Sequence, residues 1–258
     1  MKKLILFTFS LASLTIHADT GIVAEKLSRY KEFLEQGTYD GQDWSKFKRM
    51  PLSRYYTFRR AFEHFEQNNG KVIVELGTSR SFTHGGHIGC NLDDPRYWFP
   101  KNPEHWDWGA GFFTRMAAES LQHLNPKIHT IDIMHQHIQR CRVMTADFKD
   151  MIKYHVCSSL DFLRRCKAES IDLLYLDTGD MWPIDPTAEL QLEEAKILVE
   201  RNVLTKNGIL LIDDVQNQTP VKFGETSGLG KSKYAIPYLL EHGFEIVENE
   251  YQVILRKK

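Results

Sequence analysis

From about residue 70 to the carboxyl end, short apolar runs alternate with longer amphipathic stretches. The runs are five to seven residues long and rich in β-branched residues, which is typical of strands buried inside a sheet. The stretches between them repeat apolar residues at helical spacing. This alternation predicts an α/β fold, a doubly wound and mostly parallel sheet covered by helices. The predicted strands in this part are 71–76, 128–133, 154–158, 171–177 and 208–213.

Two crossover helices are predicted between these strands, at 111–124 and at 186–206, the second with Asp185 as its cap. A further helix at 234–241 precedes the segment FEIVENEYQVILRK, which reads as two short strands joined by a tight turn. We therefore expect a C-terminal antiparallel hairpin that completes a seven-stranded sheet.

Residues 19–70 are expected to form an N-terminal helical cap over one edge of the sheet, with helical segments at 20–35 and 52–68. A set of arginines and tyrosines lies in the second segment. It either touches a ligand or forms an amphipathic packing face with solvated arginines, and the pattern favours packing. These residues are Arg54, Tyr55, Tyr56, Arg59 and Arg60.

The first 18 residues have the pattern of a secretory signal peptide. Lys2 and Lys3 precede an apolar run at 4–16, and cleavage is expected after Ala18. The run is shorter than the roughly 20 residues that a membrane-spanning helix needs. The protein is thus expected to be exported, periplasmic or secreted; the alternative is a cytoplasmic protein whose first residues pack as an amphipathic helix.

Composition and charge limit the classes of partner that the protein is expected to bind. The 258 residues contain 33 Lys plus Arg and 34 Asp plus Glu, so a net charge of −1 provides no basic surface for nucleic acid. With 42% hydrophobic and 26% charged residues the chain is globular, and a small molecule is the expected partner. The four cysteines match no zinc pattern and are read as core thiols, although export would permit disulfides. They are Cys90, Cys141, Cys157 and Cys166.

Polar and acidic residues end the predicted strands, where ligands bind in open α/β sheets. Gly77 allows a cofactor to approach the backbone, and Asp132 at the end of the second strand is suited to the hydroxyls of a ribose. This pattern indicates a nucleoside site. The first loop reads ELGTSRS and lacks the G-x-G-x-x-G of dinucleotide-binding proteins, so a pyrophosphate is not expected.

Together with the later DLLYLD, GILLIDD and the terminal hairpin, this loop resembles the class I S-adenosylmethionine-dependent methyltransferases over about residues 70–258. The resemblance implies a Rossmann-like methyltransferase fold and S-adenosyl-L-methionine as cofactor. It places Glu75, Gly77, Thr78 and Ser79 near the methionine part, Asp132 at the ribose, and Ser159 with Leu160 or Asp161 at the adenine edge. The alternatives are that Glu75 caps loop amides and that Asp132 caps a helix.

Asp177, Asp213 and Asp214 end two strands expected to be neighbours, where three carboxylates would repel one another. A divalent cation such as Mg²⁺ would relieve that repulsion. The pattern resembles the metal-dependent O-methyltransferases related to catechol methyltransferase, whose strand ends read D-x-x-x-L-D and L-L-x-D-N. The alternative is that the three aspartates cap helices and bind cofactor indirectly, without a metal.

The pattern leaves several candidates for the catalytic base. That subgroup carries a lysine three residues after its first metal aspartate, whereas this chain has Asp180 there, beside Asp177. Asp180, His84, His87 or Lys231 would serve as the base, or metal coordination alone would acidify the hydroxyl.

A long insertion separates Gly77 from Asp132. The distance is 55 residues instead of roughly 20, and most of the excess lies at about 82–108. This segment holds three of the five tryptophans and three histidines, so we predict a substrate lid. Its His84-x-x-His87-x-x-Cys90 spacing is a weaker indication of a soft-metal site, and its aromatic residues would equally form a small core of their own.

The sequence thus predicts a methyltransferase domain at 71–258 that methylates a hydroxyl oxygen of a small molecule with the help of a divalent metal. Two rivals stay open: a metal-independent sugar or natural-product methyltransferase, and an exported binding protein that keeps the fold without catalysis. Full activity in excess chelator would distinguish the first, and absence of turnover the second.

Overall fold

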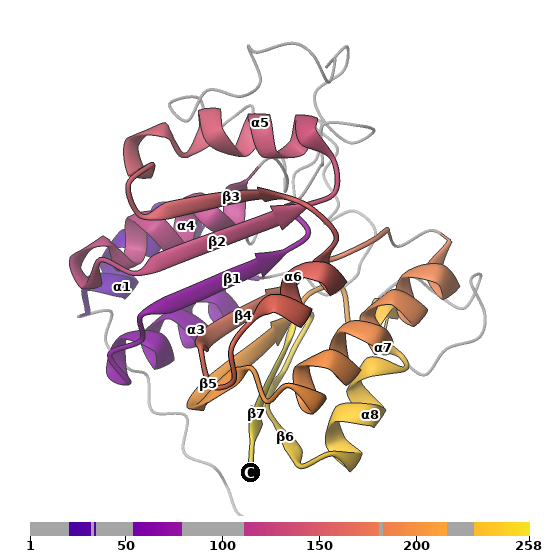
Figure 1. Ribbon diagram of the computed structural model, residues 1–258. Helices are drawn as coiled ribbons and strands as arrows, with labels where there is room; N and C mark the ends of the chain where they lie inside the picture. Colours follow the sequence, from indigo (N-terminus) through magenta and orange to yellow (C-terminus); the bar gives the residue numbers. More distant parts are fainter. Residues whose placement is uncertain (1–20, 32–33, 35–53, 79–110, 181–182, 216–229) are drawn as a thin grey trace, which may run out of the picture.

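A computed structural model describes residues 21–31, 34, 54–78, 111–180, 183–215 and 230–258 (Figure 1). The predicted leader at 1–18, Ser79, and the predicted lid at 82–108 with His84, His87 and Cys90 lie outside the described residues.

The centre of the fold is a seven-stranded sheet with the order β3-β2-β1-β4-β5-β7-β6. The first five strands run parallel, and β7 is antiparallel to both β5 and β6. The predicted doubly wound sheet with a C-terminal antiparallel hairpin is therefore confirmed. The strands are β1 Val72–Leu76, β2 Lys127–Asp132, β3 Ile152–Val156, β4 Ile171–Leu176, β5 Leu204–Ile212, β6 Phe244–Asn249 and β7 Val253–Lys257.

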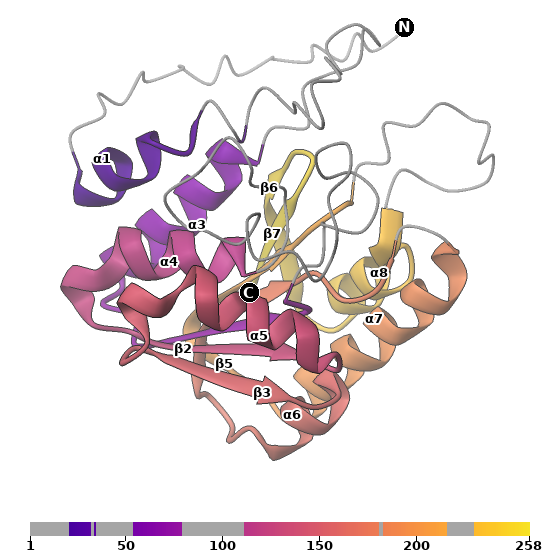
Figure 2. The ribbon, with the colours of Figure 1, turned by 90° about the horizontal axis from the view of Figure 1, so that it is seen from above.

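Helices cover both faces of this sheet, as Figures 1 and 2 show. Alternate strand residues point to opposite faces: Ile73 packs with α1, α3 and α4, whereas Val74 packs with α6, α7 and α8. The helices are α1 Ile22–Ser28, α3 Tyr55–Gln67, α4 Phe112–Leu121, α5 His135–Met144, α6 Ser159–Arg165, α7 Ile184–Glu200 and α8 Ala235–Glu241, with short 3₁₀ turns at η5 Gln122–Leu124, η6 Ala146–Phe148 and η8 Gly230–Ser232.

The two described cap helices lie over a face of the sheet and not over its edge, so the predicted position of the cap is wrong. Helix α3 contacts β4, β5 and β7, and α1 packs on α3 and α4. Phe58 and Phe62 of α3 are buried in the same core as Phe113 of α4 and Tyr175 of β4. Burial of each aromatic ring contributes about 1.5 to 3 kcal/mol, which fixes α3 to the sheet.

The helix predicted at 186–206 has different ends. It begins at Ile184 after Pro183, so Asp185 is not its cap, and Pro186 is tolerated because first-turn amides have no partner within the helix. It ends at Glu200 because Asn202 turns into the left-handed region with a φ of 51°. Strand β5 then starts at Leu204, four residues earlier than predicted.

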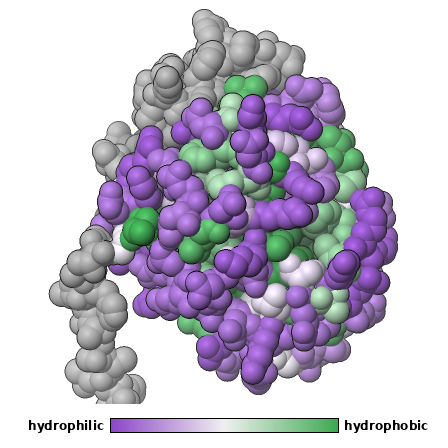
Figure 3. Space-filling model, turned by 60° about the vertical axis from the view of Figure 1, so that its left-hand side comes forward, coloured by the Kyte–Doolittle hydropathy of each residue, from purple (hydrophilic) through white to green (hydrophobic). Residues whose placement is uncertain are grey.

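The face drawn in Figure 3 mixes hydrophilic and hydrophobic residues, with the hydrophilic ones in the majority. None of the helices in the described part of the chain combines the length and the apolar character needed to cross a membrane.

Candidate active site

The order of the strands reverses between β1 and β4, and the loops after these two strands touch. Gly77 follows β1 with a φ of 87°, and a Cβ atom there would lie 2.5 Å from the carbonyl oxygen of Asp177. Only glycine fits this close approach. A glycine is therefore required at position 77 because two backbone segments pack closely there. This point is the switch point, where ligands bind in this class of sheet.

Glu75 is fully buried at the end of β1. Its Oε2 accepts hydrogen bonds from Thr114 of α4 and, at 2.7 Å, from Thr130 of β2. Burial raises the pKa of Glu75 to about 8, although these hydroxyl bonds work against the rise. The partners are hydroxyls and not loop amides, so Glu75 joins β1, β2 and α4, and its contact with a cofactor stays a prediction.

Asp132 ends β2 with its side chain 11% exposed. Its Oδ1 accepts a hydrogen bond of 2.7 Å from the backbone N–H of Met134 and lies 3.1 Å from Nδ1 of His137. Both contacts lie at the start of α5, whose N-cap is Met134, so Asp132 is not the helix cap that the alternative predicts. Its Oδ2 makes no hydrogen bond with the described residues, which leaves an acceptor at the predicted ribose position.

The two residues predicted at the adenine edge lie differently. Ser159 is buried at the start of α6, and its hydroxyl bonds Glu194 of α7. Asp161 is exposed on α6, where it lies 3.3 Å from Arg164. Thr78 is buried against Thr130. The structure therefore does not bring Ser159 and Asp161 together with Asp132 through any described contact.

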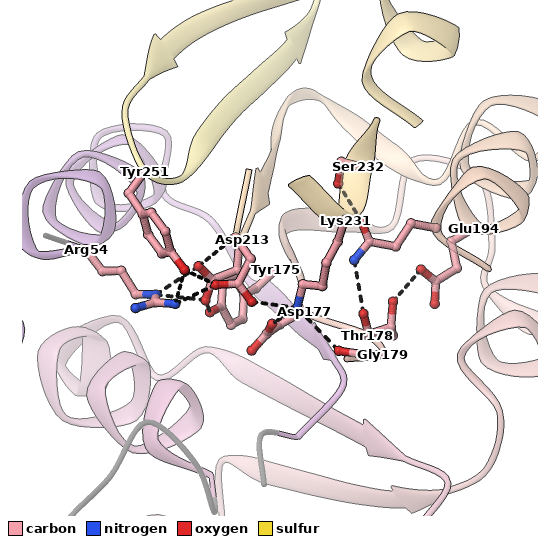
Figure 4. Close-up of polar contacts among 12 residues, drawn as sticks. Arg54, Tyr175, Asp177, Thr178, Gly179, Glu194, Asp213, Lys231, Ser232 and Tyr251 are labelled. Carbon is pink, nitrogen blue, oxygen red and sulfur yellow. Dashed lines mark hydrogen bonds and ion pairs between the residues drawn. The ribbon is translucent and has the colours of Figure 1, made fainter. Parts of the chain in front are cut away.

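Asp177, Asp213 and Asp214 do lie together, at the carboxyl ends of β4 and β5. Figure 4 shows Asp177 and Asp213 with Lys231 and Arg54. Two cations from distant segments hold them. Lys231 Nζ lies 2.6 Å from Asp177 Oδ1 and 2.9 Å from Asp214 Oδ2. Arg54 Nε lies 2.8 Å from Asp213 Oδ1, and its Nη2 lies 2.9 Å from Asp214 Oδ1.

Tyrosines complete this cluster. Tyr175 of β4 donates to Asp213 Oδ2 at 2.5 Å, and Tyr251, just before β7, donates to Asp214 Oδ1. The Arg54 guanidinium also lies 4.3 Å from the centre of the Tyr251 ring, within the range of a cation–π contact. We call Asp177, Asp213, Asp214, Lys231 and Arg54, with these two tyrosines, the ion cluster.

Charges in the ion cluster stabilise one another. Burial lowers the pKa of Lys231, but the carboxylates of Asp177 and Asp214 outweigh burial and raise that pKa above its ordinary value. Burial acts in the opposite direction on Asp214, yet Lys231 and Arg54 hold its pKa well below the usual range. Lys231 is therefore a permanent cation, which argues against its predicted alternative role as a base.

The three aspartates do not fit a divalent cation as they lie here, because both oxygens of Asp213 and Asp214 and Oδ1 of Asp177 already contact Lys231, Arg54 or the tyrosines. Within the described ranges, no three His, Cys, Asp or Glu side chains form a group that could hold a metal ion. The predicted metal site is thus not shown. Asp180, predicted as the base, is exposed three residues after Asp177.

Sequence reasoning missed Arg54. The prediction of solvated arginines is wrong for this residue, which is only 7% exposed, and Tyr55 is buried too. Arg59 pairs with Glu63 on the same helix, and Arg60 is exposed beside Glu248. The signal that was available is the excess of strand-end acids, which requires buried cations somewhere in the chain.

Known proteins share the fold of this sheet. A methyltransferase-domain family matches residues 108–215. The fold is similar to an SAH-bound methyltransferase from Podospora anserina, with a TM-score of 0.52, 15% identity and coverage of 95% of this chain and 99% of the other. No curated protein sequence matches significantly.

Two further solved structures share the fold. A caffeoyl-CoA O-methyltransferase-like protein from Staphylococcus aureus has a TM-score of 0.53, 12% identity and coverage of 90% and 91% of the two chains. A protein from Corynebacterium glutamicum has a TM-score of 0.51, 12% identity and coverage of 94% and 92%. Together, the family match and the fold support a class I S-adenosylmethionine-dependent methyltransferase, as the sequence resemblance predicts.

Proposed function

We propose that the protein transfers the methyl group of S-adenosylmethionine to a hydroxyl oxygen of a small-molecule acceptor. The observation that carries this proposal is the arrangement at the switch point. Asp132, whose Oδ2 bonds no described residue, lies at one strand end, and an ion cluster lies at the ends of β4 and β5. Asp132 is suited to bind the methyl donor, and the ion cluster is suited to lie beside the acceptor.

The donor side is formed by the ends of β1 and β2. An aspartate at the end of the second strand accepts hydrogen bonds from ribose hydroxyls in folds of this type. Asp132 has one oxygen fixed by Met134, so its carboxylate is oriented before a ligand arrives. Glu75 ties Thr130 and α4 to the strand that leads into Gly77, and its predicted contact with the cofactor belongs to this proposal.

The acceptor side is formed by the loop after β4. S-adenosylmethionine supplies a sulfonium methyl group, and transfer requires the acceptor oxygen to be held in line with it. The O–CH3 bond forms as the S–CH3 bond breaks, and the electron pair of the broken bond stays on the sulfur of S-adenosylhomocysteine. The fixed positive charge of Lys231 near the loop favours loss of the hydroxyl proton, because that loss makes the oxygen more negative. We assign the hydroxyl proton to a carboxylate at the end of β4, where Asp177 and Asp180 lie.

Calorimetry with S-adenosylmethionine and S-adenosylhomocysteine tests the donor side. We expect Asp132→Ala to weaken S-adenosylhomocysteine binding at least tenfold, and Asp150→Ala, which removes an exposed acid near η6, to leave it unchanged. Absence of binding by the wild-type protein would refute the proposed function.

Transfer of labelled methyl groups to a panel of catechols, sugars and other hydroxyl compounds tests the acceptor side. Labelled product with an O-methyl group is the expected result. Tight binding of the cofactor without transfer to any member of the panel would instead favour the non-catalytic binding protein.

A further inference from the structure

The ion cluster has its own internal cations, and each carboxylate oxygen of Asp213 and Asp214 accepts at least one hydrogen bond or ion pair within it. Asp213 receives Arg54 Nε on both oxygens, at 2.8 and 3.0 Å, together with the hydroxyl of Tyr175 and the backbone N–H of Asp214. Asp214 receives Arg54 and Tyr251 on Oδ1 and Lys231 on Oδ2. A metal ion would have to displace these donors.

The N–H donors of Lys231 are also all in use. An ammonium group has three N–H donors, and Nζ has three acceptors: Asp177 Oδ1 at 2.6 Å, Asp214 Oδ2 at 2.9 Å and the carbonyl oxygen of Gly179 at 3.4 Å. Lys231 is 2% exposed, so water does not replace these contacts. The ammonium thus sits between the carboxylates of two neighbouring strands, as a bridging cation would.

The backbone around Lys231 is built to hold it there. Gly230 has a φ of 50°, and a Cβ atom at this position would lie only 1.8 Å from the carbonyl oxygen of Asp214. On the other side, Ser232 bonds Gln191 of α7 at 2.5 Å, and Gln191 bonds the carbonyl oxygen of Thr178 at 3.1 Å. The turn η8 is therefore fixed to both β-strand loops that carry the aspartates, as Figure 4 shows.

We propose that Lys231 and Arg54 take the place of the divalent cation that the sequence pattern predicts, so that the site holds its three aspartates together without a metal. Three carboxylates and two cations leave a net charge of −1, and a divalent ion within bonding distance of Asp177 and Asp214 would lie against the Lys231 ammonium. Repulsion between like charges excludes it. The placement on the acceptor side rests on the proposed function, but the absence of metal binding does not.

Binding of Mn²⁺ to the full-length protein, followed by electron paramagnetic resonance of the free ion, tests this proposal. We expect no Mn²⁺ to bind at Asp214 in the wild type, so any weak binding should be the same in the wild type and in Asp214→Asn. Lys231→Ala should gain a site for one Mn²⁺, at least tenfold tighter than any wild-type binding, and lose it again when combined with Asp214→Asn. Lys233→Ala is the matched control, because Lys233 pairs with exposed Asp185 outside the cluster.

Binding that depends on Asp214 in the wild type would overturn the proposal, and this result does not need a folded variant. A folded Lys231→Ala protein without any gain of Mn²⁺ would overturn it as well. Lys231→Met, which keeps most of the apolar stem, serves the same purpose if the alanine variant does not fold. Failure of methyl transfer would refute the proposed function alone, because Mn²⁺ binding is measured without donor or acceptor.

Discussion

The two sides of the switch point carry the same kind of residue in opposite electrostatic settings. On the β1 and β2 side, Glu75 is bonded to two threonine hydroxyls and Asp132 to a backbone amide. On the β4 and β5 side, each aspartate contacts Lys231 or Arg54. The role of an acidic residue at a strand end therefore depends on its partners. They determine whether the residue holds a proton, binds a ligand or anchors a distant segment.

The difference also shows in the ionisation of these groups. Burial raises the pKa of Glu75 to about 8, since its only compensation comes from neutral hydroxyls. Asp214 is largely buried, with its side chain 15% exposed, but Lys231 and Arg54 keep its pKa well below the usual range. Removing a cation from the ion cluster should therefore lower the free energy of unfolding. Removing the charge of Glu75 should raise it at high pH.

The largest effect is expected from Arg54→Met. This change leaves Asp213, 3% exposed, without its cation, and breaking one side of a buried ion pair costs about 3 to 5 kcal/mol. The free energy of unfolding, measured in urea, should fall by that amount. The double variant Arg54→Met/Asp213→Asn should recover part of the loss, because the unpaired charge is then absent.

Arg60→Met is the control for this substitution. Arg60 lies on the same helix, but its side chain is 66% exposed and 3.2 Å from Glu248. Exposed pairs contribute about 0 to 1 kcal/mol, so little change is expected. Equal destabilisation by the two substitutions would show that Arg54 does not neutralise a buried carboxylate.

Glu75→Gln should have the opposite sign at high pH. The folded-state pKa of Glu75 is raised from 4.5 to about 8, so its contribution to stability is fully present below about pH 4.5 and is lost as the pH rises through about 8. Between pH 5 and pH 9 the wild type should lose about 2 to 4 kcal/mol relative to Glu75→Gln. Urea unfolding at both pH values measures this loss.

Glu25→Gln changes an exposed glutamate of α1 and should leave the pH dependence of the wild type unchanged. Parallel pH curves for wild type and Glu75→Gln would contradict the uncompensated burial of Glu75.

Much of the fold was predictable from the sequence because a buried parallel strand is a continuous apolar run. The residues of β1 and β4 follow this pattern, each with one acidic residue. The end of α7 was missed because helical periodicity continues past Glu200, and only the left-handed turn at Asn202 ends it. The cap was placed at an edge because amphipathicity predicts a buried face without saying which surface it meets.

The acids of the site were predictable and their counterions were not. Asp177, Asp213 and Asp214 follow their strands directly, so parallel pairing alone brings them to one end of the sheet. Arg54 reaches Asp213 from 159 residues away, and Lys231 reaches Asp177 from 54 residues away. Only tertiary packing decides such contacts. The glycine directly before Lys231 was the one local signal of a constrained backbone.

The smallest predicted effect concerns that glycine and distinguishes the two sides of the site. Gly230→Ala adds strain at a φ of 50° and a clash with the Asp214 carbonyl, whereas Gly243→Ala adds only strain, since nothing lies within 4 Å of a Cβ there at a φ of 85°. Gly230→Ala should therefore cost about 1 to 2 kcal/mol more in urea unfolding than Gly243→Ala. Because it displaces Lys231 and not Asp132, it should slow methyl transfer at least tenfold and leave S-adenosylhomocysteine affinity within threefold of wild type. A parallel loss of affinity would mean that the two sides act as one unit.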